Sequence, residues 1–565
     1  MKLTRVIGLA FAACQAAARE VDQVVLASSE NAVAPLSVAI IGAGAGGAST
    51  AYHLSKFAAA AGFAVNITVF ERNDYIGGRS TTVDVYDDAA SPVELGASIF
   101  VKANHILESA VTAVRTIISQ NSKRPSFNLS TRSMVSGTSE IPGASLGVFD
   151  GIAFAFVQET NSLTWWESAK ALWKWGLAPI RCNALRKTTV DRFDKMYDEP
   201  QFPFASLTQV VTDVELLDAT SATGENYICE NGLTGSFGHD VIQASTRVNY
   251  AQNAIGQLRH INGLLAMVCM STDGAKSVEN GNWQIFDEMI AKANATTRLS
   301  TEVSSVTQGK DGTYLLRHGP STDSLDLADH ESTAFDVVVL AAPHQFANIT
   351  LDHHIAHIPE KITYVQLHVT LLTSPHLLSP AFFNMPPGKP APKTILTTLP
   401  PNEEPQEGAA GVGKPGFFSV SLLRPLTNPK TGGQEYLYKI FSPEPPNSTF
   451  LTQLLGLKQL HHHLESGISE EDISWIYRKV WDSYPYEVPR IIANSANPIQ
   501  QVTFEEIQLH EPLLHKRHGR FHLHNGDQCS DGYERRETHS GSVASEDGEG
   551  NGEGWNGSVD VAAAE

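Results

Sequence analysis

The stretch VAIIGAGAGG, residues 38–47, decides the fold of this chain. Four apolar residues predict a buried strand, and a G-x-G-x-x-G sequence follows at once. Residues 48–61 then predict an alanine-rich helix, and residues 65–70 predict a second strand that ends at Glu71. Strand, glycine loop, helix, strand and acid form the β-α-β unit that binds the pyrophosphate of a dinucleotide.

Each residue type in this unit has a physical task. We expect Gly42 to permit the tight turn, Gly44 to let a pyrophosphate approach the backbone, and Gly47 to let the helix pack on the strand. The amide groups at the start of the helix favour negative charge. The Glu71 carboxylate would accept hydrogen bonds from ribose hydroxyls. Glu71 lies further from the glycines than the usual ~20 residues, and a longer helix and loop absorb the difference.

The next residues resemble a known class of flavin enzymes. ERNDYIGGR, residues 71–79, and ELGAS, residues 94–98, are similar to two signatures of amine-oxidase-like flavoproteins. In that resemblance Arg79 pairs with phosphate, the backbone near Val303 contacts the adenine, and a buried strand over residues 335–342 ends at the cofactor. The residues assigned to FAD are Gly42, Gly44, Gly46, Gly47, Glu71, Arg72, Gly78, Arg79, Gly96, Ala97, Ser98, Val303 and Pro343.

Beyond the flavin signatures, roughly residues 36 to 512 resemble the prenylcysteine oxidase (prenylcysteine lyase) family. The pieces that carry the resemblance are VELGASIFVKANHIL (93–107), TRVNYAQN (246–253), SVENGNWQIFDEMI (277–290), APKTILTTL (391–399) and PGFFSVSLL (415–423). The sequence ENGN, residues 279–282, departs from the paired glycines that the family shows before the asparagine. We expect this departure to have a local effect only.

The resemblance implies an oxidative cleavage of farnesyl- or geranylgeranyl-cysteine. FAD accepts a hydride from the carbon attached to sulfur, water adds to that carbon, and an aldehyde and cysteine separate. Molecular oxygen then takes the electrons and leaves as hydrogen peroxide. We assign no catalytic side chain, because the cofactor performs the redox chemistry. Two alternatives stay open: a related flavin amine oxidase with another substrate, and an inactive glycoprotein that binds prenyl lipid or partner proteins.

The predicted fold class is α/β, a Rossmann-like FAD-binding domain interleaved with an α+β substrate domain. Residues 36–100 and 231–345 are predicted to build the FAD-binding part, and residues 101–230 and 346–500 the substrate part. The Pro- and Gly-rich residues 386–414 predict a long exposed loop. The tryptophan-rich helix over residues 164–175 has three interpretations: core packing, the lining of a prenyl site, or contact with a membrane surface.

Composition and the N-terminus predict the compartment. The net charge of −20 argues against nucleic-acid binding. Residues 1–18 have the layout of a signal peptide, and no later run is apolar enough for a transmembrane helix. Five cysteines without a C-x-x-C pair, and three adjacent histidines at 461–463, predict no metal site. We expect a glycoprotein of the secretory pathway, in a lysosome or vacuole or secreted, glycosylated at Asn128, Asn294, Asn348 and Asn447; the sequon at Asn66 is doubtful because it lies in a predicted strand.

The C-terminal stretch HKRHGRFHLHNGDQC, residues 515–529, suggests a metal or nucleic-acid site only at first sight. The family ends in a segment of the form T-S-x-x-E-x-x-x-S-T-M-E that closes on the flavin, and residues 501–530 lack it. A permitted codon string for residues 515–529, read one base later, encodes T-S-G-M-E-x-S-I-S-T-M-E-T-S. We therefore hypothesise a frameshift, a splicing difference or a gene-prediction error near Leu513. Residues 531–565 predict a disordered acidic tail.

Overall fold

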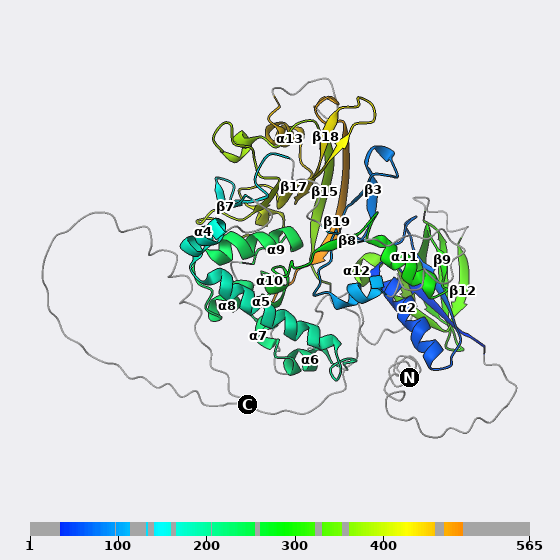
Figure 1. The fold of residues 1–565 in the computed structure, drawn as a ribbon. Helices are drawn as coiled ribbons and strands as arrows, with labels where there is room; N and C mark the ends of the chain where they lie inside the picture. The colour runs from blue at the N-terminus through cyan, green and yellow to red at the C-terminus, as the bar shows by residue number, and fades with distance from the viewer. Residues whose placement is uncertain are drawn as a thin grey trace, which may run out of the picture. The chain divides into compact units, whose positions relative to one another are not determined.

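The computed structural model describes ten segments of the chain (Figure 1). These are residues 34–96, 98–112, 131–133, 141–159, 165–204, 206–254, 260–321, 330–352, 361–457 and 468–489. The predicted signal peptide, the trio of histidines at 461–463, Asn128, the expected closing segment 501–530 and the acidic tail lie outside them.

The nucleotide-binding unit forms a four-stranded parallel sheet with strand order β13-β1-β2-β9. Its strands are β1 (Leu36–Ile41), β2 (Val65–Phe70), β9 (Thr296–Arg298) and β13 (Val337–Leu340). Helices α2 (Ala45–Ala60) and α11 (Trp283–Lys292) pack on one face, where Val38, Ile40, Ile67 and Val69 are buried. The predicted Rossmann-like architecture is confirmed. The strands could be predicted because parallel strands that are covered on both faces have continuous apolar sequences.

The helix and one strand differ from the predicted bounds. Helix α2 begins at Ala45, three residues before the predicted start, with Gly44 as its N-cap. The predicted strand over residues 335–342 is two strands in two sheets, β12 (Glu331–Phe335) and β13, divided at Asp336. The Asp336 carboxylate accepts hydrogen bonds from the Ser37 amide and hydroxyl at 2.8 and 2.7 Å. This link turns the chain from the one sheet to the other.

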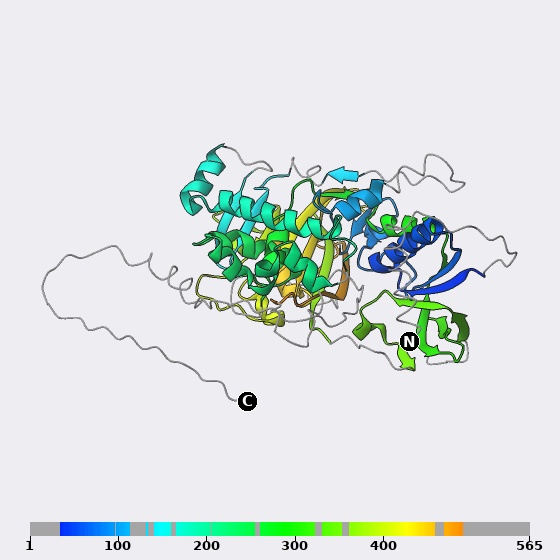
Figure 2. The same cartoon turned by 90° about the horizontal axis from the view of Figure 1, so that it is seen from below.

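The second sheet covers the other face of the parallel sheet (Figure 2). Its order is β12-β11-β10-β14, with β10 (Thr301–Gln308), β11 (Tyr314–Pro320) and β14 (Thr350–Asp352). Ala39, Ile41 and Phe70 of the parallel sheet share a buried cluster with Val303 and Leu316 of the second sheet. The parallel sheet is therefore sandwiched between helices and a second sheet.

A separate seven-stranded sheet has the order β19-β15-β18-β17-β16-β6-β7. Its strands are β6 (Leu146–Phe149), β7 (Phe154–Gln158), β15 (Tyr364–Ser374), β16 (Thr394–Thr397), β17 (Ser419–Thr427), β18 (Gln434–Ser442) and β19 (Trp475–Pro485). The prediction of one long exposed loop over residues 386–414 is wrong, because β16 lies inside this sheet and residues 395–400 are mostly buried. Proline and glycine mark the turns around β16, and its Thr-Ile-Leu-Thr core is an ordinary strand sequence.

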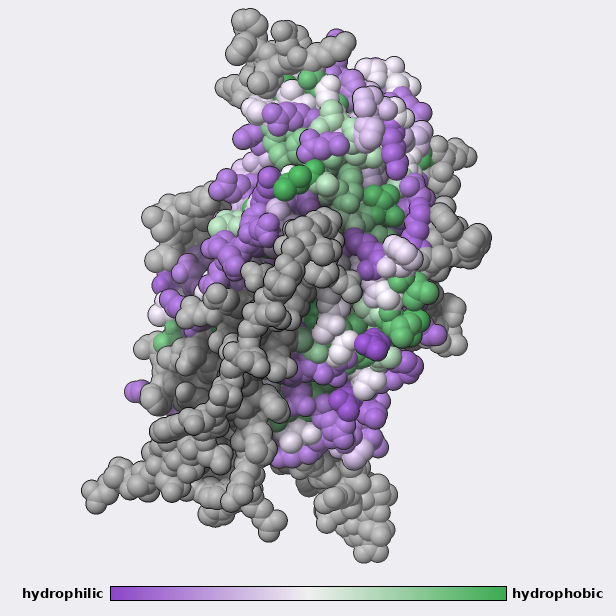
Figure 3. All heavy atoms as spheres, turned by 90° about the vertical axis from the view of Figure 1, so that its left-hand side faces the viewer, coloured by the Kyte–Doolittle hydropathy of each residue, from purple (hydrophilic) through white to green (hydrophobic). Residues whose placement is uncertain are grey.

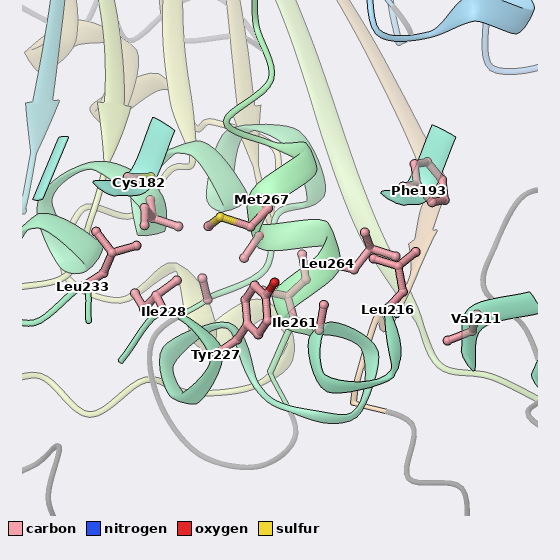
Figure 4. Close-up of a cluster of buried hydrophobic side chains, with 14 of the residues drawn as sticks. Cys182, Phe193, Val211, Leu216, Tyr227, Ile228, Leu233, Ile261, Leu264 and Met267 are labelled. Atoms are coloured by element: carbon pink, nitrogen blue, oxygen red, sulfur yellow. The ribbon is translucent and has the colours of Figure 1, made fainter. Parts of the chain in front are cut away.

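A layer of helices gathers around a third core (Figure 4). Cys182 of α5, Tyr227 of α8 and Met267 of α10 point toward one another there, and all three are buried. The helices are α4 (Trp165–Trp175), α5 (Ala178–Asp194), α6 (Leu207–Asp213), α7 (Leu217–Ser221), α8 (Gly224–Glu230), α9 (Gln243–Tyr250) and α10 (Gly263–Val268). This core draws on residues from 178 to 267.

Short elements complete the described chain. The hairpin of β3 (Thr82–Asp84) and β4 (Pro92–Glu94) contains the 3₁₀ turn η1 (Val85–Asp87). The remaining elements are β5 (Thr131–Ser133), β8 (Lys276–Val278), α12 (His344–Ala347), α13 (Ser448–Leu455), η2 (Lys195–Tyr197), η3 (Gly238–Ile242), η5 (Pro380–Phe383) and η6 (Gly408–Val412). Within the described segments, no helix is both long and apolar enough to cross a bilayer.

Candidate functional site

The site begins where β1 ends and α2 starts. Gly42 has a φ of +108°, and a Cβ at this position would lie 2.8 Å from the Ala341 carbonyl oxygen after β13. A Cβ on Gly47 would lie only 1.9 Å from the Gly42 carbonyl oxygen. Both glycines are therefore required by packing. Pro343, the predicted cofactor contact after β13, is the N-cap of α12 and lies two residues beyond Ala341.

The N-terminus of α2 is open for an anion. Gly44 is its N-cap, no side chain caps it, and no acidic residue lies in its first turn. A Cβ on Gly44 would make an ordinary contact, 3.8 Å from the Gly78 Cα atom. Gly46 is half-buried in the first turn, and its carbonyl accepts a hydrogen bond from Thr50. The free amides and the helix dipole make this end suited to a pyrophosphate.

Glu71 lies at the end of β2, 6% exposed, and links three segments. Its Oε2 accepts from the Ala43 amide at 2.8 Å, and its Oε1 accepts from the Asn73 amide at 2.9 Å. Its carbonyl accepts from the Thr301 amide at the start of β10. The Asn73 side-chain amide also donates to Oε1, at 2.6 Å. Three of the roughly four acceptor positions of the carboxylate are therefore used, and one is left for a ribose hydroxyl. The predicted adenine contact, Val303, is buried two residues beyond Thr301.

The segment 77–79 lies against the glycine loop. The Gly77 amide donates to the Ala43 carbonyl at 3.0 Å, and a Cβ on Gly78 would lie 3.3 Å from the Gly44 Cα atom. Arg79 is half-buried, and its guanidinium donates to the Ser483 carbonyl on β19. Arg72 is exposed. The structure therefore brings Gly78 to the N-terminus of α2, whereas Arg79 reaches toward the seven-stranded sheet.

The segment 94–98 is held against β18 by a buried lysine. Lys439, 7% exposed, donates to the Glu94 carbonyl at 2.9 Å and to the Ser98 hydroxyl at 2.7 Å. A Cβ on Gly96 would lie 2.4 Å from the Arg79 carbonyl oxygen, so only glycine fits there. Ala97 lies outside the described residues. Lys439 is a site residue that the sequence analysis missed.

The Glu94 side chain carries an unusual electrostatic state. Its Oε1 accepts from the Asn282 amide at 2.5 Å, whereas its Oε2 is buried without a hydrogen-bond partner. Burial raises the pKa of Glu94 to about 7, against the lowering effects of the Asn282 amide and Lys439. Burial also lowers the pKa of Lys439 to about 8. Asn282 belongs to the sequence ENGN, which differs from the family pattern. This motif therefore helps to hold Glu94.

The β3–β4 hairpin, which leads into this segment, is anchored to the seven-stranded sheet at two further points. The Tyr86 hydroxyl donates to Glu435 Oε2 at 2.7 Å and lies 2.8 Å from the Ser474 hydroxyl. Tyr86 has a φ of +59°, a strained value for a tyrosine. Arg424 of β17 donates to the Ser91 hydroxyl at 2.8 Å. The hairpin therefore joins the nucleotide unit to the larger sheet.

These features fit a dinucleotide. The described site has an uncapped helix N-terminus, backbone-only walls at Gly44 and Gly78, and a carboxylate at the end of β2. The fold and the site thus define a Rossmann-like dinucleotide-binding protein of the α/β class.

Comparison with known proteins then gives the family. Residues 40–111 match the family described as NAD(P)-binding Rossmann-like domain, and residues 158–513 match the family described as prenylcysteine lyase. The second match covers more than half of the chain, so this protein belongs to the prenylcysteine lyase family. The match ends at Leu513, where the sequence analysis places the break in the reading frame.

Curated relatives extend over most of the chain. Farnesylcysteine lyase of Arabidopsis thaliana is 25% identical over 474 residues, covering 81% of each chain. Prenylcysteine oxidase 1 of Homo sapiens is 25% identical over 470 residues, covering 80% of this chain and 81% of the human protein. Among solved structures, putrescine oxidase bound to putrescine has a TM-score of 0.44 and 13% identity, covering 79% of this chain and 84% of that chain. Prenylcysteine oxidases are FAD enzymes.

A fully buried arginine is a second residue that the sequence analysis did not single out, although it lies in the family piece 246–253. Arg247 donates to Asn253 Oδ1 at 2.8 Å and to the Gly411 and Val412 carbonyls at 2.7 Å each. Burial lowers the pKa of Arg247 to about 9. These bonds tie α9 to η6.

The other predicted residues lie apart from this site. Trp175 packs on Phe156 and Phe237, so part of the tryptophan-rich helix is core, whereas Trp173 is 93% exposed. The side chains of residues 165–169 are not described. Asn294, Asn348 and Asn447 are exposed, as glycan attachment requires. Asn66 is exposed on β2. In the described segments, no group of histidine, cysteine and acidic residues could hold a metal ion.

Proposed function

We propose that this protein is an FAD-dependent thioether oxidase that cleaves farnesyl- or geranylgeranyl-cysteine to a prenyl aldehyde, cysteine and hydrogen peroxide. The observation that carries the proposal is a direct contact between the Rossmann-like region, residues 40–111, and the prenylcysteine lyase region, residues 158–513. Segment 94–98 follows the nucleotide unit, and Lys439 from the prenylcysteine lyase region binds it directly. When bound, FAD supplies the hydride acceptor and passes the electrons to molecular oxygen.

The protein's own residues bind and orient. The amides at the start of α2 would hold the pyrophosphate, and Glu71 would hold the ribose. Lys439 fixes segment 94–98 through the Glu94 carbonyl and Ser98, so the substrate side and the cofactor side keep one spacing. Rigid positioning of the reacting C–H bond is what the protein must add to the cofactor's chemistry.

An aromatic row on β19 is suited to the prenyl chain. Trp475, Tyr477 and Trp481 are half-buried on one face of the strand, and the rings of Trp475 and Tyr477 stack at 6.3 Å. A Cβ on Gly96 would lie 3.4 Å from the Trp481 ring. Burial raises the pKa of Tyr75, and its neighbours Glu71 and Tyr477 raise it further. The row therefore borders segments 71–79 and 94–98, which we expect to contact the cofactor, and we place the isoprenoid along it.

A pair of adjacent residues tests this placement. Tyr477→Ala should raise KM for farnesylcysteine about tenfold, because it removes an aromatic contact surface from the row. Ile476→Ala, on the opposite face of β19 and 36% exposed, should leave KM unchanged. Equal KM values in the two variants would place the isoprenoid elsewhere.

The reaction itself is tested with the full chain and added FAD. Farnesylcysteine should reduce the flavin without oxygen, and with oxygen it should release hydrogen peroxide, aldehyde and cysteine in equal amounts. Putrescine should release none. Peroxide from amines alone would indicate a related amine oxidase, and flavin that no thioether reduces would indicate an inactive prenyl-binding glycoprotein.

The cellular setting is part of the same proposal. The N-terminal sequence and the sequons support a glycosylated protein of the secretory pathway, lysosomal, vacuolar or secreted. Prenylcysteine is an amphiphile with a long apolar tail, so we also propose that the enzyme meets it at a membrane surface. Release of glycans from Asn294, Asn348 and Asn447 by an amidase, followed by mass spectrometry, tests the compartment.

A further inference from the structure

Helix α4 is fixed in one orientation by its inner face. The Trp175 Nε1 donates to Asp240 Oδ2 at 2.9 Å, and Lys174 Nζ lies 2.9 Å from the same oxygen. The Trp175 ring packs on Phe156 and Phe237 at 5.2 and 5.4 Å between centroids. Hydrogen bonds from His239, Lys174 and Trp175 lower the pKa of Asp240 to about 2 despite its burial. The opposite face of α4 is therefore held outward.

Trp173 lies on that outward face, and three further apolar side chains are exposed where α4 meets α5. Within nine residues around the end of α4 and the start of α5, Leu172 is 52% exposed, Trp173 93%, Leu177 54% and Ile180 65%. Gly176, at a φ of +56°, makes the turn between the two helices. We call these four side chains the α4–α5 patch. Figure 3 views the side on which α4 is drawn in Figure 1, and hydrophobic residues there stand in small groups among hydrophilic ones.

The charges around the patch differ from those of the whole chain. Residues 168–190 contain no aspartate or glutamate, although the chain has 61 acidic residues and a net charge of −20. Three of their basic residues pair with aspartates: Lys174 with Asp240, Arg186 with Asp273 and Lys187 with Asp191. Lys170 and Arg181 are exposed on either side of Trp173 in the sequence. Arg181 donates to the Gly232 carbonyl at 3.1 Å.

We propose that the α4–α5 patch docks on the surface of a phospholipid bilayer. Trp173 and the three aliphatic side chains enter the boundary between headgroups and acyl chains, and the exposed Arg181 side chain meets the lipid phosphates. Tryptophan prefers this boundary because its ring is apolar and its N–H is polar. An anionic leaflet attracts basic side chains that lie near its surface.

A bilayer fits the patch better than a second copy of the chain. Even if each of the four side chains had the roughly 250 Å² of a tryptophan, their exposed fractions of 52% to 93% would leave about 660 Å² at most for a contact. A stable protein interface needs about 800 Å² from each partner. A bilayer has no such threshold, since binding grows with each inserted side chain. The inference does not depend on the oxidase reaction, because docking requires no turnover.

Vesicle flotation with the full glycosylated chain tests the proposal. The protein should float with vesicles of phosphatidylcholine and phosphatidylserine, and more weakly with phosphatidylcholine alone. The double variant Trp173→Ser with Ile180→Ser should reduce the partition coefficient at least tenfold. The matched control is Phe63→Ser, since Phe63 is 67% exposed at the end of α2, away from the patch in the sequence. Circular dichroism checks that both variants are folded.

A second measurement separates docking from a general loss of stability. Trp173→Phe keeps an apolar ring, so it should retain most of the vesicle binding that Trp173→Ser loses. Three results would overturn the proposal: no flotation of the wild type, equal flotation of wild type and double variant, or a concentration-dependent dimer that the double variant abolishes.

Discussion

Two glycines of one motif act through different contacts, although their sequence context is the same. Gly47 is needed by the fold, since its Cβ would meet the Gly42 carbonyl oxygen at 1.9 Å. Gly44 has room for a Cβ and an ordinary φ of −75°. At the scale of single residues the structure thus gives Gly47 a packing role and leaves room at Gly44 for its predicted role in binding.

This separation predicts opposite results for two alanine substitutions. Gly47→Ala should lower the melting temperature by several degrees, because α2 must move off β1. Gly44→Ala should melt like the wild type but bind FAD at least tenfold more weakly, because its methyl group occupies the path of the pyrophosphate. Thermal melting without cofactor and titration with FAD check the pair. A normal FAD affinity in Gly44→Ala would show that the cofactor does not bind there.

Glu94 predicts a pH dependence of stability. Its pKa is about 7 in the folded protein and 4.5 as the ordinary value. The native state therefore binds more protons between these values, and the free energy of unfolding should fall as pH rises from 4.5 to 7. The loss from this group should be about 2–3 kcal/mol. Glu94→Gln should remove it, whereas the exposed Glu331→Gln should not, in denaturant unfolding at pH 5 and 7. An unchanged slope in Glu94→Gln would show that Glu94 ionises normally.

At the scale of elements, the β3–β4 hairpin is held in place by contacts with the seven-stranded sheet. It is two short strands, and a two-stranded hairpin is marginally stable alone. Tyr86, Ser91, Glu94 and Ser98 bind the hairpin and the segment that follows it to β17 and β18. The hairpin thus fixes segment 94–98 relative to the seven-stranded sheet.

Tyr86→Phe tests this anchor. It leaves Glu435 and Ser474 without the tyrosine hydroxyl, and it should cost about 1–3 kcal/mol of unfolding free energy. It should also increase proteolysis within residues 82–94, because the hairpin is freed from the sheet. Tyr52→Phe on α2 is the control and should change neither readout. A Tyr86→Phe protein as stable and as protease-resistant as the wild type would contradict the anchoring role.

At the scale of the whole molecule, the predicted break in the reading frame has a direct test. Sequencing of the transcript should show the T-S-G-M-E frame after Leu513. A chain carrying that tail should retain more bound FAD than the printed chain, measured as flavin absorbance per protein after gel filtration. A transcript that continues in the printed frame would remove the hypothesis. Equal FAD retention would show that the tail does not contact the flavin.

The nucleotide unit was predictable because its information is local. Strand β2 has the predicted bounds 65–70, and the turn glycines follow β1 directly. Apolar periodicity and glycine spacing act over a few residues, so they are legible without the fold. The error at residues 386–414 has the same origin, since proline and glycine report turns but not the partners of the strand between them.

The sequence by itself determined the order of the β-α-β unit, the positions of its turn glycines and the family. Only the tertiary structure decided which distant groups meet. Lys439 reaches Glu94 across 345 residues of chain, and Asp336 reaches Ser37 across 299. The packing buries Glu94, which raises its pKa, and it leaves Trp173 exposed. These properties arise from desolvation and long-range contact, which depend on the packing of the whole chain and not on any local pattern.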